Sequence, residues 1–143
     1  MLPFCGYNMA DHWAHWLRVG RALGDAAPRI FRVNWFRKDA GGRYLWPGFG
    51  DNIRVVEWIV DRLEDTVEAD WSPLGGLPWP EDLDLVGLDL PDDDTAELLR
   101  IDAGSWLAET EKIAALFATF GERLPTAMTQ RLASLRRRLV AQG

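Results

Sequence analysis

Several features that usually indicate a function are scarce or missing in this 143-residue sequence. It has one cysteine, Cys5, which excludes internal disulfides and thiolate metal clusters, so we expect a reducing, cytoplasmic location. Basic residues are not in excess: 16 lysines and arginines against 22 acidic residues give a net charge of −6, which argues against a nucleic-acid partner. No apolar run approaches the ~20 residues of a membrane span, and the first residues lack the layout of a secretion signal.

Common catalytic motifs are also missing. There is no G-x-x-x-x-G-K-[ST] phosphate loop, and residues 48–52, GFGDN, contain only half of a G-x-G-x-x-G fingerprint. His12 and His15 lie three positions apart but have no third ligand at a suitable spacing, so surface or half-buried histidines are favoured over a metal site. The acidic run 92–94 is interpreted as part of a solvated loop. We therefore expect no catalytic residue and no metal ligand in this chain.

Aromatic residues, in contrast, are plentiful, with eight tryptophans among them. Residues 34–52, NWFRKDAGGRYLWPGFGDN, place five rings around four glycines and a proline. Because the backbone bends and lies open at glycine and proline, these rings suit a flat ligand. The alternative is that they fill a core beneath a hairpin, and composition alone leaves the two interpretations about equal.

The patterning predicts a mixed, helix-rich α/β fold with one β-hairpin and about four helices. A first helix follows the capping residue Asn8, and residues 30–36 favour a strand that pairs with 43–46 across a turn at 39–42. Asp51 or Asn52 caps a second helix, and 65–94 is a long surface connection. Two amphipathic helices close the chain. The predicted apolar stripes of the last three helices are Val55, Val56, Ile59 and Leu63; Trp106, Ile113, Phe117, Phe120 and Leu124; and Met128, Leu132, Leu135 and Leu139.

Four segments, LPFCGYN, AHWL, RIFRVNWFRKD and YLWPGFGDN, together resemble the C-terminal portion of GTP-dependent phosphoenolpyruvate carboxykinase. They stand in family order across residues 2–58; beyond residue 64 only an outline of a loop region and two terminal helices is shared. The resemblance implies a C-terminal fragment of that enzyme's nucleotide-binding domain. It divides the chain into a guanine-binding region (1–64), a loop region (65–104) and terminal helices (105–143).

The resemblance also assigns roles to residues of the aromatic stretch. It implies that Phe36 and Phe49 sandwich guanine, that Tyr44 lines the edge of the base, and that Asn52 hydrogen-bonds it. Stacking does not discriminate between bases, and an Asn amide turned over could hydrogen-bond adenine instead. Selectivity for guanine would therefore also need backbone groups of the turn before Asn52, which includes Gly50 and Asp51. Family members often have Phe at the position of Tyr44, and Asp51 replaces a frequent Glu.

The family reaction converts oxaloacetate and GTP to phosphoenolpyruvate, GDP and carbon dioxide. The resemblance implies monomeric enzymes that use Mn²⁺ or Mg²⁺, with the metal ligands, phosphate loop and substrate arginines upstream of this chain. We therefore expect the chain to bind guanine nucleotide, to need the upstream portion of the enzyme as its partner, and to be inactive alone. Two alternatives remain open: a non-catalytic purine-binding module, and an interaction domain that uses exposed aromatic residues.

Overall fold

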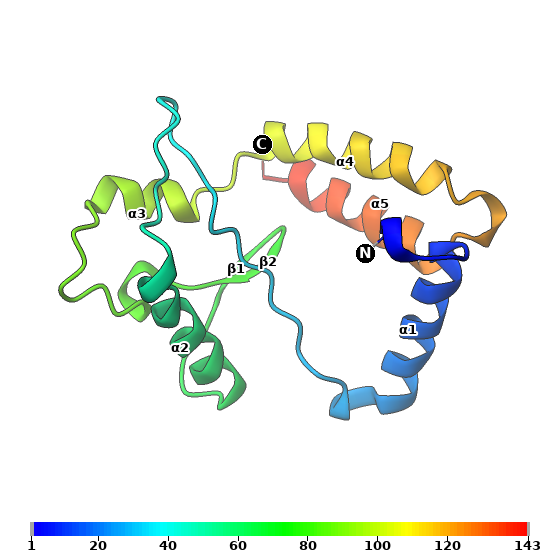
Figure 1. The fold of residues 1–143 in the computed structure, drawn as a ribbon, viewed down its shortest axis with the longest axis horizontal. Helices are drawn as coiled ribbons and strands as arrows, with labels where there is room; N and C mark the ends of the chain where they lie inside the picture. The colour runs from blue at the N-terminus through cyan, green and yellow to red at the C-terminus, as the bar shows by residue number, and fades with distance from the viewer. Residues whose placement is uncertain (1, 143) are drawn as a thin grey trace. The chain divides into compact units, whose positions relative to one another are not determined.

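A computed structural model describes residues 2–142, which form two compact units. The first unit comprises residues 2–28 and 102–142, and the second comprises residues 29–101. Figure 1 shows the elements in chain order. They are the helices α1 (Met9–Leu23), α2 (Asn52–Leu63), α3 (Asp92–Leu99), α4 (Ala103–Ala118) and α5 (Thr126–Val140), and the strands β1 (Asp70–Ser72) and β2 (Gly75–Leu77). Within the described residues, none of the helices has the length and apolar character needed to cross a membrane.

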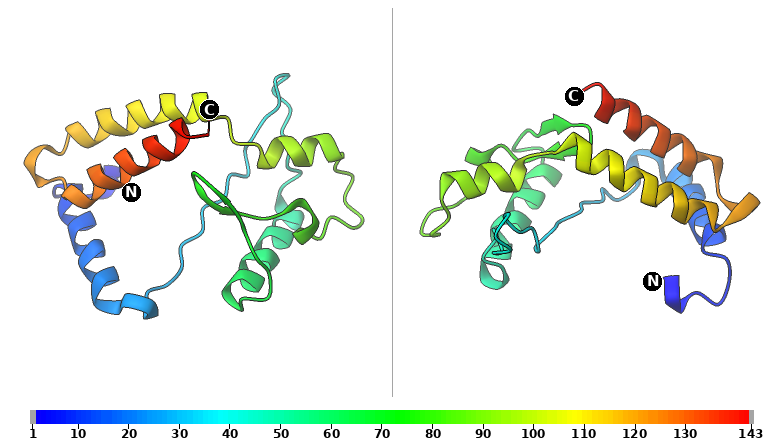
Figure 2. Two further views of the ribbon diagram at one scale, coloured as in Figure 1. Left: turned by 180° about the vertical axis from the view of Figure 1, so that it is seen from behind. Right: turned by 90° about the horizontal axis from the view of Figure 1, so that it is seen from above.

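The first unit is a helical assembly in which α4 and α5 lie side by side (Figures 1 and 2). Its core contains Met9, Ala10 and Phe120, and the Trp13 ring packs edge-on against Phe120 with centroids 4.8 Å apart. This places the start of α1 against the turn that follows α4. The predicted first helix and the two predicted terminal helices are confirmed, and so is Asn8, whose side chain accepts a hydrogen bond from the Ala10 N–H at 2.9 Å.

The fully buried threonine of this unit has hydrogen-bond partners, whereas the buried Nε2 atom of His12 has none among the described residues. Thr110 of α4 is fully buried, and its hydroxyl and carbonyl accept hydrogen bonds from the Arg136 guanidinium of α5 at 3.0 and 3.1 Å. Arg123, in the turn between α4 and α5, pairs with Asp11 of α1 at 2.8 Å. The Arg136 contacts fix the register of α5 on α4, because leaving the buried Thr110 unpaired would be unfavourable. The exposed Arg123 pair links α1 to the turn between α4 and α5.

The second unit contains a loop where the sequence predicted a hairpin of two regular strands. Among the described residues, one isolated bridge, Lys38 with Tyr44, flanks the predicted turn. Residues 30–36 form no strand, so the strand predicted there is wrong. The Asn34 side chain accepts a hydrogen bond from the Phe36 N–H at 3.0 Å, which is a local turn that competes with extended pairing. Ile30 is 85% exposed, so the start of this apolar run is largely uncovered.

The segment 65–94, predicted as a surface connection, contains regular structure instead. Strands β1 and β2 form a tight antiparallel hairpin in which Ser72 pairs with Gly75. Gly75 has φ = +134°, a conformation that other residues rarely adopt. The acidic run 92–94 forms the first turn of α3, where negative charge suits the helix dipole, so its interpretation as a solvated loop is wrong. Helix α3 is a fifth helix beside the four predicted ones.

Helix α2 is present as predicted, but its buried face differs from the predicted stripe. Trp58 is the buried residue, whereas Val56 and Leu63 are 42% and 49% exposed. The Phe31 and Trp58 rings form a T-shaped pair, with centroids 6.3 Å apart. A single bulky tryptophan thus anchors α2, while Val55 and Ile59 of the predicted stripe are half-buried and Val56 and Leu63 are exposed.

Candidate functional site

The loop 37–45 brings two of the predicted site residues together. Backbone hydrogen bonds from Asp39 to Arg43 and from Leu45 to Arg37, each 3.0 Å, close the loop. This geometry places the Phe36 and Tyr44 rings in an edge-to-face pair with centroids 6.3 Å apart and an interplanar angle of 66°. Both rings remain open, with 73% of Phe36 and 52% of Tyr44 exposed.

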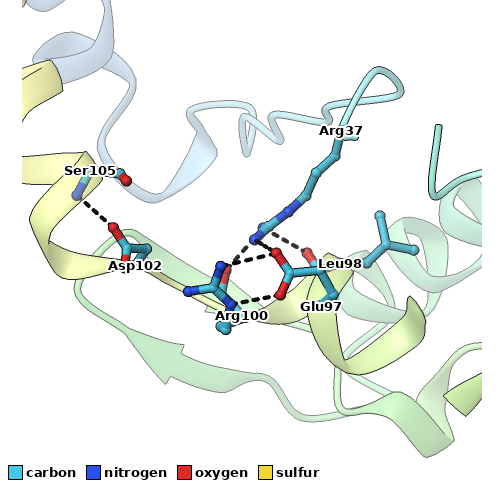
Figure 3. A network of polar contacts seen from close by, with 6 residues as sticks. All are labelled: Arg37, Glu97, Leu98, Arg100, Asp102 and Ser105. Carbon is cyan, nitrogen blue, oxygen red and sulfur yellow. Dashed lines mark hydrogen bonds and ion pairs between the residues drawn. The ribbon is translucent and has the colours of Figure 1, made fainter. Parts of the chain in front are cut away.

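Helix α3 holds this loop through Arg37, at the end of the helix. Figure 3 shows the Arg37 guanidinium reaching the last turn of α3. It donates to the carbonyls of Leu98 and Arg100 at 3.2 and 2.9 Å and to the Glu97 carboxylate at 3.1 Å. Since carbonyls at a helix C-terminus lack intrahelical partners, a guanidinium is a favourable group there.

The other side of the loop is held through Arg43, at the start of α3. Its guanidinium makes a two-point ion pair with Asp94, both N–O distances being 2.8 Å, and also contacts Asp39 at 3.1 Å. Two-point pairs of this kind fix orientation as well as distance. The loop that carries Phe36 and Tyr44 is therefore attached to both ends of one short helix.

The pKa values reflect these contacts. Hydrogen bonds from Arg100, and then from Arg37, lower the pKa of Glu97 to about 2, although partial desolvation acts in the opposite direction. The hydrogen bond from Arg43 lowers the pKa of Asp94, and the same pair raises the pKa of Arg43. All of these groups therefore stay ionised near neutral pH, and the attachment is electrostatically stable there.

Phe49 has the most unusual environment in the predicted site. It follows Gly48 and has φ = +47°, a left-handed conformation that is unfavourable for a bulky residue. Its ring is 99% exposed and makes no ring contact with any other described residue. Backbone strain combined with a fully exposed ring is a pattern found at ligand sites.

Gly50 and Asp51 complete the turn before α2. A side chain added at Gly50 would meet no atom within 4 Å, so this stretch of backbone is open to close approach. The Asp51 N–H donates to the Gly48 carbonyl at 3.2 Å, and its carboxylate pairs with Arg54 at 3.2 Å. Asp51 occupies the N-cap position without a side-chain capping bond. The predicted cap position is therefore confirmed, but the side chain makes no capping hydrogen bond because its carboxylate pairs with Arg54.

Asn52 is the first residue of α2, and its side chain is held in place. The Asn52 Oδ1 atom accepts a hydrogen bond from Nε1 of Trp46 at 2.9 Å. Trp46 itself is only 6% exposed. The amide oxygen of Asn52 is therefore held by a buried tryptophan.

The structure brings some of the predicted site residues together and leaves others apart. Phe36 pairs with Tyr44, whereas Phe49 contacts neither ring. Sequence reasoning missed Arg37, Arg43 and the Trp46 indole. The available signal was weak: Arg37 follows Phe36, Arg43 precedes Tyr44, and an acidic run lies at 92–94 in the sequence.

Metal binding can be tested against the side chains that are present. The part of the chain that the structure describes contains no group of three or more His, Cys, Asp or Glu side chains suited to a metal ion. Nδ1 of His12 lies 3.1 Å from the Tyr7 hydroxyl, and the His12 ring also contacts Trp16. These residues do not fit a divalent-cation site.

Comparisons with known proteins agree on one family. A family model described as the phosphoenolpyruvate carboxykinase C-terminal P-loop domain matches residues 1–138. The GTP-dependent phosphoenolpyruvate carboxykinase of Neocallimastix frontalis is 47% identical over 143 residues. Those of Corynebacterium efficiens and Paenarthrobacter aurescens are 43% identical over 141 and 140 residues. The alignments cover 99%, 99% and 97% of this chain but 23% of each relative. The chain therefore belongs to the GTP-dependent phosphoenolpyruvate carboxykinase family and corresponds to the C-terminal part of its members.

Proposed function

We propose that residues 36–52 form the guanine-binding part of a GTP-dependent phosphoenolpyruvate carboxykinase. In this arrangement Phe36 and Phe49 cover the two faces of the base, Tyr44 lines its edge, and Asn52 hydrogen-bonds it. The backbone of Gly50 and Asp51 lies against the base. The observation that carries the proposal is Phe49, a fully exposed ring on a strained backbone one turn before Asn52.

The affinity of the isolated chain for a guanine nucleotide follows from the magnitudes of the expected interactions. Stacking is worth about 1–3 kcal/mol for each ring that contacts the base. Edge hydrogen bonds add about 0.5–1.5 kcal/mol each, whereas association costs an estimated ~4–15 kcal/mol. The balance is close to zero without phosphate contacts, so the 143-residue chain binds GTP and guanosine about equally, at millimolar strength or weaker.

The complete reaction belongs in this proposal to the intact enzyme, which converts oxaloacetate and GTP to phosphoenolpyruvate, GDP and carbon dioxide. Phosphoryl transfer depends on charge stabilisation by cations and a phosphate cradle. This sequence has no G-x-x-x-x-G-K-[ST] motif. Mn²⁺ or Mg²⁺ is accordingly held by residues of the upstream portion, and this chain positions the base without taking part in the chemistry.

The upstream portion of the same enzyme is the proposed partner. Exposed apolar side chains are numerous, among them Ile30, Val56 and Leu63, and such surfaces mark interaction sites. In this proposal residues 1–64 contain the guanine-binding region, residues 65–104 support it through α3, and residues 105–143 supply the terminal helices. The units of the fold do not follow these boundaries, because residues 2–28 and 29–64 fall in different units.

A chimera tests this function. In the chimera, the matching segment of the Corynebacterium efficiens enzyme is replaced by this 143-residue chain. We expect GTP-dependent phosphoenolpyruvate formation from the chimera and none above background from the chain alone. A Phe49→Ala chimera should require more GTP for half-maximal rate. Activity of the isolated chain, or an unchanged GTP requirement in Phe49→Ala, would contradict the proposal.

A further inference from the structure

The hydrogen bond between Trp46 and Asn52 has a consequence for base selectivity. The indole N–H is a donor only, whereas an Asn amide has one acceptor oxygen and one donating NH₂ group. The 2.9 Å contact with Nε1 therefore requires the amide oxygen, and not the nitrogen, to face Trp46. Asn52 cannot turn its amide over without placing two donors against each other.

Both ends of this hydrogen bond are held in place. Trp46 is 6% exposed, so its ring is fixed by packing. The Asn52 backbone N–H donates to the carbonyls of Gly50 and Phe49, which fixes the residue at the start of α2. A side-chain orientation set by a buried partner and an anchored backbone does not need the ligand in order to form, and such preorganisation favours selective binding.

We propose that Trp46 is a positioning residue that makes the site selective for 6-oxopurines over 6-aminopurines. This inference rests on the proposed contact between Asn52 and the base. With its oxygen engaged by Trp46, the amide offers its NH₂ donors to the ligand. These donors match the O6 carbonyl of guanine and oppose the 6-amino group of adenine, which is itself a donor.

The same geometry predicts the effect of a near-isosteric change at Asn52. In Asn52→Asp the carboxylate still accepts from the Trp46 indole, but its second oxygen replaces the NH₂ donors. That oxygen repels O6 of guanine and accepts from the 6-amino group of adenine. The change should therefore weaken guanosine binding and reverse the preference toward adenosine, whereas Asn52→Ala should only reduce the preference.

The test compares guanosine and adenosine binding to the 143-residue chain by saturation-transfer NMR, which suits weak binding. It uses Trp46→Phe and, because a smaller ring could disturb packing, a second variant with 3-benzothienylalanine at position 46. The latter has sulfur in place of the N–H and nearly the same shape. Trp71→Phe, on the 75% exposed Trp71, is the matched control. The same variants are then compared in the chimera through the GTP-to-ATP preference.

We expect both Trp46 variants to lose roughly three- to tenfold of the guanosine preference, the value of one hydrogen bond, while the control keeps it. The benzothienyl variant should keep the thermal unfolding midpoint. An unchanged preference in that variant, together with a reduced one in Asn52→Ala, would overturn the role of Trp46 and leave the guanine site intact. If neither the chain nor the chimera distinguishes guanine from adenine, or Asn52→Ala and Phe49→Ala change no binding, the proposed function itself is wrong.

Discussion

Phe49→Ala separates a ligand-binding role from a structural one because the Phe49 ring is 99% exposed. Removing a side chain that buries almost no surface removes almost no hydrophobic stabilisation. Alanine at φ = +47° carries the same backbone strain as phenylalanine, so this term also cancels. The free energy of unfolding should therefore change by less than about 0.5 kcal/mol.

The effect of the same substitution on nucleotide affinity should be much larger. Loss of one stacking face removes about 1–3 kcal/mol, which weakens binding by about fivefold to 150-fold. Stacking does not depend on the base, so GTP and ATP should weaken by the same factor. Phe49→Gly relieves about 1–2 kcal/mol of strain in the left-handed backbone conformation. Glycine also loses about 0.5–1 kcal/mol more conformational entropy on folding. The free energy of unfolding should therefore equal or slightly exceed that of the unsubstituted protein.

Two assays on the chimera decide this prediction: chemical denaturation for stability and nucleotide titration for affinity. Phe4→Ala is the matched control, because Phe4 is 89% exposed but has no proposed contact with the base. Unchanged affinity in Phe49→Ala would refute the stacking role. A loss of stability beyond 1 kcal/mol would show that the ring packs against the protein, contrary to its exposure.

Three further predictions concern the framework around the site. The pKa of Glu97 is lowered to about 2, so its ion pairs stabilise the fold above about pH 4.5, and this stabilisation is lost as the pH falls toward 2. Glu97→Gln should therefore make the denaturation midpoint less dependent on pH over that range. Lysine in Arg43→Lys cannot reproduce the two-point ion pair with Asp94, so this substitution should weaken guanosine and adenosine binding several-fold. The helix content measured by circular dichroism should stay unchanged. Unaltered binding would show that the attachment to α3 does not position the site. Gly76→Ala should destabilise the fold by about 1–3 kcal/mol, because the added Cβ would lie 2.8 Å from the Cβ of Ala69. Gly20→Ala should stabilise the fold by about 0.5–1 kcal/mol, because the added Cβ lies inside α1 and meets no atom within 4 Å. Thermal unfolding measures both effects.

Helices were the most predictable part of the fold because their signals are local. Asn8 as a cap and the apolar spacing of the terminal segments both lead to helices that the structure contains. The strand over 30–36 was wrong because an apolar, aromatic run indicates only that a segment suits a sheet, and pairing depends on a partner elsewhere in the chain. Asn34, two residues before Phe36, diverts the backbone into a turn instead.

The roles of the site residues follow from the family resemblance. Neither that resemblance nor the residue pattern predicts the contacts that hold these residues in place. Arg43 and Asp94 are 51 positions apart, and nothing in the sequence selects that pair among many arginines and aspartates. The Trp46 indole could not be assigned as a hydrogen-bond donor to Asn52 before the turn between them was known. The acidic run 92–94 has the composition of a loop, and its charges mask the helix that it begins.

The most direct test of the account maps where guanosine binds on this chain. Backbone amide NMR spectra of the 143-residue protein would be recorded during titration with guanosine and, as the matched ligand, adenosine. We predict that the largest shifts for guanosine lie at Phe36, Tyr44 and residues 49–52, with smaller shifts for adenosine at the same positions. Shifts concentrated elsewhere, for example at the cavity of about 550 Å³ lined by Trp79 and Arg100, would contradict the assignment of the guanine site to residues 36–52.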